Sequence, residues 1–494
     1  MRRVPHELWE EIFSICVAEQ RFQAESDSKK MEETKVDVEW RTMFVTPFRL
    51  AGVCLRWRTI VTSTPALWSS VFYNLDWADR EPALSLYLER SGERDLDIFL
   101  CDVQRSDLSR QSHSVQEERV DRSGALAFQM LLDRMPRIQG FLVVSPALHL
   151  PFPDTQPFNC SFERLRSFNV RAHPEYPSWF FEAVSQAPFL EQLVVPNDMF
   201  RENPFNRGIA MNPMVKYLEL SDVEGECLNA IMNLQHLESL KIETLRSCRP
   251  IEAARSTLRR LTIDNGDREV LEILQSVEMP HLQSLHVPWL SDDPSPDHTL
   301  LVLSKFSSVQ HFSLLEGSEY FRTGRLVNFL RHLPNLVTFR FGAGYEDPAD
   351  IEDASATLCT FLSYLVNTPH RLETLSLSLL DVSITNETCT ALIRLVEAWT
   401  QKRTIPSLKY IYLLAAEFPK RGWKKLASQL QASEGQGFEW VVGNKVLYSE
   451  MFQEDREHGT ITIQAAGYTS QAHFDMYRMS DSRPQIHTIS LVLS

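Results

Sequence analysis

Residues 237–242 read LESLKI, a hexad with apolar side chains at its first, fourth and sixth positions. Four further copies keep this form: VKYLEL (215–220), LRRLTI (258–263), LQSLHV (282–287) and LETLSL (372–377). Six looser copies extend the series in both directions: IQGFLV (138–143), LRSFNV (165–170), LEQLVV (190–195), VQHFSL (309–314), LVTFRF (336–341) and LKYIYL (408–413). A short strand that recurs so often predicts a stack of similar structural units.

The spacing of the hexads identifies the kind of stack. Successive first positions are separated by 21 to 27 residues in eight steps and by 36 residues in the last two. This period resembles that of leucine-rich repeats, which are about 20–29 residues long. We therefore predict an α/β fold, in which residues 80–434 form a curved leucine-rich-repeat solenoid with a parallel inner sheet and outer helices.

The stretches between hexads have helical periodicity. Residues 354–367 and 389–399 each place apolar side chains on one face, and residues 82–90 form a further expected helix. LDIFL (96–100) fits an additional first strand. Residues 435–494 contain β-like runs and are predicted to be a C-terminal cap or extension.

The bulk composition limits the classes of partner. The chain has 494 residues and a formal net charge of −15, which disfavours nucleic acid as the main partner. The eight cysteines form no C-x-x-C pair, and we expect small buried thiols in a reducing compartment. Neither a signal peptide nor an apolar run long enough for a membrane span is present, so a cytoplasmic or nuclear location is expected.

Catalytic signatures are missing from the sequence. It contains no phosphate-binding glycine loop, no nucleophile elbow and no Cys/His spacing typical of a metal site. We therefore predict a binding protein that is not an enzyme and that uses no metal or cofactor. A catalytic group assembled from several repeats stays open as a distant alternative.

The first 72 residues differ from the repeats. They predict a small helical domain with one helix over residues 6–18 and another from Thr46-Pro47 to Thr64-Pro65. A charged insertion at about 20–46 separates the two. Both helices are apolar over wide faces, and a domain this small buries only part of its surface. The helices therefore fit either a plain core or one half of a docking surface.

VPHELWEEIF (4–13) followed by FRLAGVCLRWRTIVTSTPALW (48–68) resembles the F-box domain. The combination with irregular repeats is similar to a family of fungal F-box proteins. That resemblance implies a substrate-recognition subunit of an SCF-type ubiquitin ligase, which takes part in protein degradation. Its F-box would bind a Skp-type adaptor and, through it, a cullin scaffold. The residues that match the adaptor-binding motif are Pro5, Leu8, Ile12, Phe13, Leu50, Val53, Cys54 and Trp57.

Two alternatives remain at this stage. The chain fits a non-degradative scaffold that binds the adaptor. It also fits a repeat protein whose first 72 residues are only a helical cap.

Strand alternation predicts which hexad residues face outward. The residue between the second and third apolar positions must leave the core, which gives Asn169, Val194, Glu219, Lys241, Thr262, His286, Ser313, Arg340, Ser376 and Tyr412. The residues just before the second apolar position form a second column that faces the same way. From both columns we select Arg260, His286, His311, Arg340, Tyr410 and Tyr412 as candidate contacts to an unknown target protein, because arginine and tyrosine favour interface hot spots. Ordinary solvated strand residues are the simpler interpretation.

Overall fold

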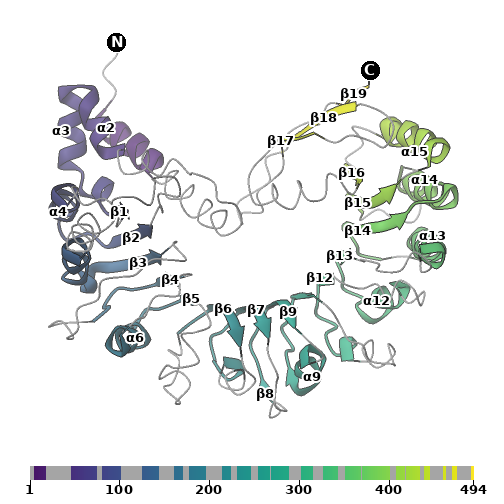
Figure 1. Ribbon diagram of the computed structural model, residues 1–494, viewed down its shortest axis with the longest axis horizontal. Helices are drawn as coiled ribbons and strands as arrows, with labels where there is room; N and C mark the ends of the chain where they lie inside the picture. The colour runs from purple at the N-terminus through teal and green to yellow at the C-terminus, as the bar shows by residue number, and fades with distance from the viewer. Residues whose placement is uncertain are drawn as a thin grey trace, which may run out of the picture. The chain divides into compact units, whose positions relative to one another are not determined.

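A computed structural model describes most of the chain (Figure 1). The described residues are 5–17, 46–74, 81–101, 125–143, 161–170, 177–195, 214–223, 228, 231–245, 254–266, 269–288, 302–314, 326–342, 351–368, 370–400, 408–417, 419–433, 439–444, 460–462, 470–475 and 491–493. The chain divides into two compact units. The first unit comprises Met1–Asp222 and Leu234–Leu237, and the second comprises Val223–Asn233 and Glu238–Ser494. The charged insertion at 20–46 lies outside the described residues apart from its last position.

The first unit contains parallel strands that pair in chain order. The described strands are β1 (Ser70–Asn74), β2 (Leu96–Cys101), β3 (Ile138–Val143), β4 (Ser167–Val170), β5 (Gln192–Val195) and β6 (Tyr217–Val223). Stacked phenylalanines occur on both faces of these strands, because Phe141 pairs with Ile98 and Phe99 is the next residue along the strand. The rings of Phe72 and Phe99 lie 4.5 Å apart, and those of Phe141 and Phe168 lie 5.6 Å apart. Each such pair joins equivalent positions of neighbouring strands, as stacked repeats require.

The helices of the first unit precede and separate its strands. A helix over residues 6–17 comes first, followed by α2 (Thr46–Val53), α3 (Leu55–Ser63), the 3-10 helix η2 (Pro65–Trp68), α4 (Glu81–Arg90), the 3-10 helix η3 (Met135–Arg137) and α6 (Ser178–Ser185). Phe180 of α6 packs 5.9 Å from Phe168 of β4. The predicted helix 82–90 and the predicted strand 96–100 are confirmed as α4 and β2.

The single helix predicted from Thr46 to Thr64 is wrong, because the chain breaks at Cys54. This residue is extended, with φ −160° and ψ 166°, and its Sγ accepts a hydrogen bond from the Trp57 backbone N–H at 3.5 Å. Cys54 therefore acts as the N-cap of α3. Gly52, a poor helix former, stands just before the break. The periodicity was compatible with one helix because α2 and α3 are separated by only one residue.

The second unit continues the same plan. Its main strands pair in parallel and in chain order: β7 (Ser239–Leu245), β9 (Arg260–Gly266), β11 (Ser284–Val287), β12 (His311–Leu314), β13 (Thr338–Gly342), β14 (Thr374–Ser383), β15 (Tyr410–Glu417) and β16 (Glu439–Asn444). A short pair, β8 (Ala254–Arg255) with β10 (Val277–Glu278), is separate. All eleven hexads thus contain strands. Four hexads lie in the first unit, and the other seven supply β7, β9 and β11 to β15.

One hydrogen-bond pattern fixes the register from repeat to repeat. Two successive backbone N–H groups donate to a single carbonyl of the preceding copy, as Val337 and Thr338 do to Gln310 at 2.7 and 2.8 Å. The next copy repeats this with Glu373 and Thr374, which both donate to the Val337 carbonyl. Equivalent hexad positions are therefore held opposite one another.

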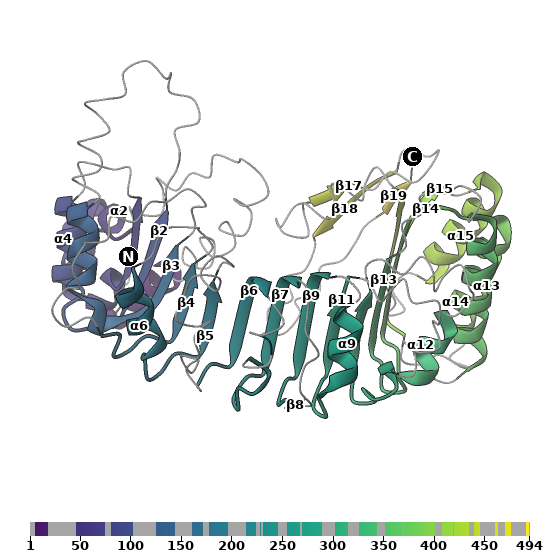
Figure 2. The ribbon, with the colours of Figure 1, turned by 60° about the horizontal axis from the view of Figure 1, so that its bottom comes forward.

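Helices cover one side of the strands in the second unit. These are α9 (Glu269–Ser276), α12 (Leu326–His332), α13 (Ile351–Asn367), α14 (Asn386–Thr400) and α15 (Lys420–Ser433). Figure 1 shows α12 to α15 along the same side of strands β12 to β16, and Figure 2 shows these helices beside β13 to β15. On β11, Leu285 and Val287 are buried while Ser284 and His286 are partly exposed. This alternation puts the core on the helix side and leaves a polar face on the other.

The compact units have other boundaries than the predicted domains, which stay predictions. The N-terminal helices belong to the same compact unit as the first strands, and that unit ends near residue 222. The sheet begins at β1, inside the region predicted to be helical. Beyond β16, three short strands pair in antiparallel fashion: β17 (Thr460–Thr462), β18 (Ser470–Asp475) and β19 (Leu491–Leu493). No helix in the described ranges is long and apolar enough to cross a bilayer.

Candidate protein-binding surfaces

An aromatic cluster attaches the first helix to α3. The Trp57 ring lies 5.0 Å from Trp9 and 4.9 Å from Phe13, and the Trp9 and Phe13 rings are 5.6 Å apart. Phe13 is only 1% exposed. The prediction that Phe13 contacts an adaptor directly does not fit this arrangement, because its ring is enclosed by Trp9 and Trp57. Phe13 instead holds together the helices on which the surface is built.

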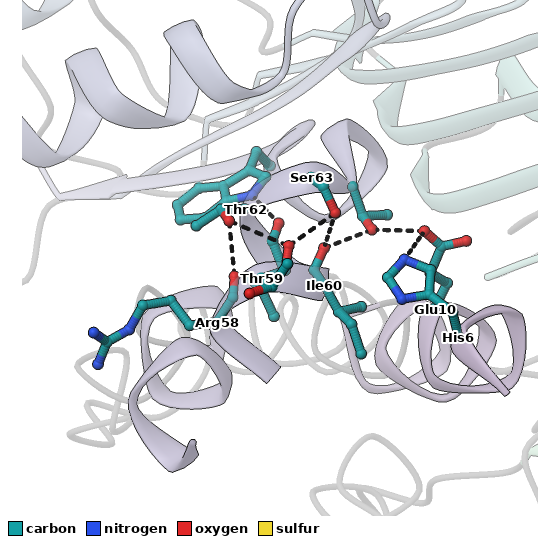
Figure 3. A network of polar contacts seen from close by, with 10 residues as sticks. His6, Glu10, Arg58, Thr59, Ile60, Thr62 and Ser63 are labelled. Carbon is teal, nitrogen blue, oxygen red and sulfur yellow. Dashed lines mark hydrogen bonds and ion pairs between the residues drawn. The ribbon is translucent and has the colours of Figure 1, made fainter. Parts of the chain in front are cut away.

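Polar contacts reinforce the same junction (Figure 3). The Thr64 hydroxyl lies 3.0 Å from Glu10 Oε1 and 2.8 Å from the Ile60 carbonyl oxygen. Glu10 also approaches His6, whose Nε2 is 3.3 Å away. Near the end of α3, Trp68 Nε1 donates to the Val61 carbonyl at 2.7 Å. The end of α3 is thus tied both to the first helix and to η2.

The first helix carries two apolar stripes with different environments. Trp9, Phe13 and Val17 face the other helices, and Phe13 and Val17 are 1% and 8% exposed. Leu8, Ile12 and Ile15 form the second stripe and are 48%, 44% and 59% exposed. A helix in a compact domain ordinarily exposes polar side chains on its outer face. The second stripe departs from that rule.

The junction of α2 and α3 exposes two more large apolar side chains. Val53 is 60% exposed and Leu55 is 77% exposed. Across the described residues, eight large hydrophobic side chains are exposed, and the other three are Leu126, Phe189 and Met214. Five of the eight therefore lie on the three N-terminal helices. We call Leu8, Ile12, Ile15, Val53 and Leu55 the apolar helix surface.

The remaining predicted adaptor contacts have mixed environments. Pro5 and Cys54 are exposed, whereas Leu50 and Trp57 are half-buried. Ile60 and Val61 lie in the core, at 1% and 0% exposure. Ile15 and Leu55 were not among the predicted contacts. Ile15 completes the i, i+4, i+7 spacing of Leu8 and Ile12, so that spacing was the available signal. Leu55 became apparent only with the break at Cys54.

The strand register brings the predicted target contacts into two rows. Ser284 of β11 pairs with Arg260 and His311, while His286 pairs with Thr262 and Ser313. The rows continue along β13, β14 and β15. One holds Thr338, Thr374 and Tyr410, and the other holds Arg340, Ser376 and Tyr412. Arg260, His286, His311 and Arg340 therefore come together on β9 to β13, whereas the two tyrosines lie two strands beyond Arg340.

Asp264 partly neutralises one end of this face. Its carboxylate lies 3.4 Å from Lys241 Nζ and 3.7 Å from His286 Nε2. Burial lowers the pKa of His286, Asp264 opposes that shift, and Arg340 and Lys241 add to it. Lys241 and Asp264 were not among the predicted contacts. Asp264 stands two residues after Thr262 in β9, so strand alternation places it on the same face.

His311 has a purely cationic electrostatic neighbourhood among the described groups. Burial lowers its pKa, and Arg260 and Arg340 lower it further. The Arg260, His311 and Arg340 side chains are all exposed. In the described part of the chain, no carboxylate pairs with either guanidinium. We call these three residues the basic strand surface.

Some outward positions turn out to be buried. Val194, Glu219 and Ser313 are 4%, 5% and 8% exposed, although alternation predicted that they face solvent. The Tyr217 hydroxyl bonds to Glu219 Oε2 at 2.6 Å on the same strand. Ser313 stands between His286 and Arg340 in its row, and both of these neighbours have longer side chains. Alternation thus gives the face of a side chain but not its exposure.

No protein-family model matches this chain, and no curated protein is significantly similar to it. Within the described ranges, no group of three or more His, Cys, Asp or Glu side chains is arranged to hold a metal ion.

Proposed function

We propose that this protein is a receptor that docks one protein through its N-terminal helices and holds a second protein on its strand face. The observation that carries this proposal is the apolar helix surface. Large exposed apolar side chains concentrated on one set of elements are typical of protein-binding sites. Burying Leu8 and Ile12 against a partner removes apolar area from water that folding leaves exposed.

The F-box resemblance of residues 4–13 and 48–68 suggests the docked protein. We propose a Skp-type adaptor, which would link the chain to a cullin scaffold and a ubiquitin ligase. Leu8, Ile12 and Val53 are both motif positions and exposed apolar side chains, and they form the centre of the proposed contact. Pro5 and Cys54 flank them, and the half-buried Leu50 and Trp57 support them.

The chain itself performs no bond chemistry under this proposal. It binds the target near the ubiquitin donor, which raises the effective concentration of target lysines. An adaptor-bound scaffold without degradation would use the same two surfaces. A ubiquitination assay with the reconstituted complex separates these two roles.

A helical cap is the second candidate role for the N-terminal helices. Aromatic packing supports it, because Phe48 of α2 lies 5.4 Å from Trp68 and 5.7 Å from Tyr87 of α4. The helices thus cover the first repeat. A capping element, however, needs a polar outer surface. The exposed stripe of Leu8, Ile12 and Ile15 is the opposite, and we favour docking.

Co-purification of the full chain with a purified Skp-type adaptor tests the proposal. We expect the double variant Leu8→Ser, Ile12→Ser to weaken binding by about tenfold or more, since each side chain contributes buried apolar area. A second double variant, Pro5→Ala with Leu8→Ala, should abolish co-purification.

The matched control is Leu126→Ser, which removes a similarly exposed leucine from another helix, residues 125–132. It should leave adaptor binding unchanged. If the double variant melts at the parent temperature and still binds the adaptor normally, the docking assignment is wrong. A parent chain that never binds the adaptor would favour the cap.

A further inference from the structure

The basic strand surface differs from the rest of the molecule in its charge. The whole chain carries a net charge of −15. Arg260 of β9 and Arg340 of β13 nevertheless extend from one strand face, with His311 of β12 between them. Each guanidinium offers five donors in a planar fork that matches a carboxylate.

The spacing of the two arginines indicates the shape of the ligand. Strands β9, β11, β12 and β13 are successive neighbours, so three strand spacings separate Arg260 from Arg340. The two Cα atoms are therefore about 14 Å apart across the strands at the usual strand separation, and Arg340 also stands two residues beyond Thr338, the position in the row of Arg260. One phosphate or carboxylate is much smaller than this, which favours two separate anionic groups. An extended peptide covers the distance with about four residues.

The surroundings of the arginines favour a polypeptide over a single small anion. Ser284 and Thr338 stand in the row of His311 and are partly exposed. These hydroxyls can donate to or accept from peptide groups lying across the strands. Asp264 contacts Lys241 and His286, and in the described residues no carboxylate pairs with Arg260 or Arg340.

We propose that strands β9 to β13 bind an extended acidic segment of a partner protein, with two carboxylates about four residues apart paired to Arg260 and Arg340. This proposal rests on the proposed function, in which the strand face holds the target, and it specifies the chemistry of that target. Charge complementarity between the segment and the two guanidiniums supplies the selectivity.

Fluorescence anisotropy with the full chain tests the proposal. The probe is a labelled twelve-residue peptide, Asp-Gly-Ser-Gly repeated three times, and the comparison peptide carries Asn in place of each Asp. We expect the acidic peptide to bind at least about tenfold more tightly at low salt, since paired carboxylates strengthen hydrogen bonds to arginine. A third peptide with its three Asp residues adjacent should bind more weakly than the spaced one.

The double variant Arg260→Gln, Arg340→Gln should lose at least about tenfold in affinity for the acidic peptide, because both charge-assisted contacts disappear. Arg331→Gln is the matched control. It removes the same charge from α12, where the guanidinium lies 5.5 Å from the Tyr364 ring on the helix side of the strands. Its affinity should equal that of the parent.

Three results would overturn the proposal: equal binding of the Asp and Asn peptides, a double variant that binds like the parent, or a single-stranded oligonucleotide of equal charge that binds as tightly as the peptide. Adaptor co-purification is measured on the same samples. Lost peptide discrimination with adaptor binding intact rejects only the acidic target. Lost adaptor binding with peptide discrimination intact rejects the proposed function instead.

Discussion

The apolar helix surface and the basic strand surface expose opposite kinds of side chain. On the first helix, the exposed stripe of Leu8, Ile12 and Ile15 is as apolar as the buried stripe beside it. On β9 to β13, alternation sends apolar side chains to the core and leaves polar and charged ones outside. A polar outer face is the ordinary outcome of folding. An apolar outer face is not, and it therefore indicates binding more strongly.

The sharpest test of this comparison uses two neighbouring residues of the first helix. Phe13→Ala should lower the free energy of unfolding by about 3–5 kcal/mol, because it leaves a cavity beside Trp9 and Trp57. Ile12→Ser, one residue earlier but on the exposed stripe, should change it by less than about 0.5 kcal/mol. Urea denaturation followed by tryptophan fluorescence reports both. Equal losses would mean that the two stripes are not distinct.

A smaller effect is expected where the first helix meets the end of α3. Thr64→Val removes the hydroxyl that lies near both Glu10 and the Ile60 carbonyl, and it should cost about 1–2 kcal/mol. Thr62→Val is the control, since its hydroxyl bonds only within α3, to the carbonyls of Arg58 and Thr59. The same denaturation experiment measures both variants. If Thr64→Val lowers the free energy of unfolding no more than Thr62→Val does, the Thr64–Glu10 contact does not stabilise the junction of the two helices.

The smallest effect concerns pH and the strand face. The folded pKa values of His286 and His311 lie below the unfolded value of 6.5. The unfolded chain then binds protons more readily than the folded chain. The two histidines therefore cost no free energy of unfolding above pH 6.5 and lower it as the pH drops through that value. The double variant His286→Gln, His311→Gln should lose less stability than the parent between pH 7.5 and 5.5. Thermal unfolding at both pH values measures this, and an equal loss in the two proteins contradicts it.

Much of the strand arrangement was predictable from the sequence. The eleven hexads marked the strands, and their common register follows because equivalent positions must stack in every copy. The two outward columns also followed from alternation, since it is a local property of extended backbone. What alternation did not give was exposure at Val194, Glu219 and Ser313. Exposure depends on the length of side chains on adjacent strands, which the pattern within one hexad does not contain.

The candidate surfaces were predictable only in part. Leu8, Ile12 and Val53 were selected by their motif positions and proved exposed. Phe13 came from the same motif and proved buried. The difference is geometric, because both stripes of the first helix have the same apolar character. Local sequence alone does not say which of them α3 will cover.

The sequence by itself determined the α/β repeat, the strand positions and the face to which each hexad side chain belongs, since all three depend on short-range periodicity. The tertiary structure decided three other matters. It broke the second helix at Cys54, packed Trp57 onto Phe13 rather than onto Ile12, and paired Asp264 with Lys241 and His286 while leaving Arg260 and Arg340 available. Each of these depends on which residues meet across separate elements, and periodicity within one element carries no information about that.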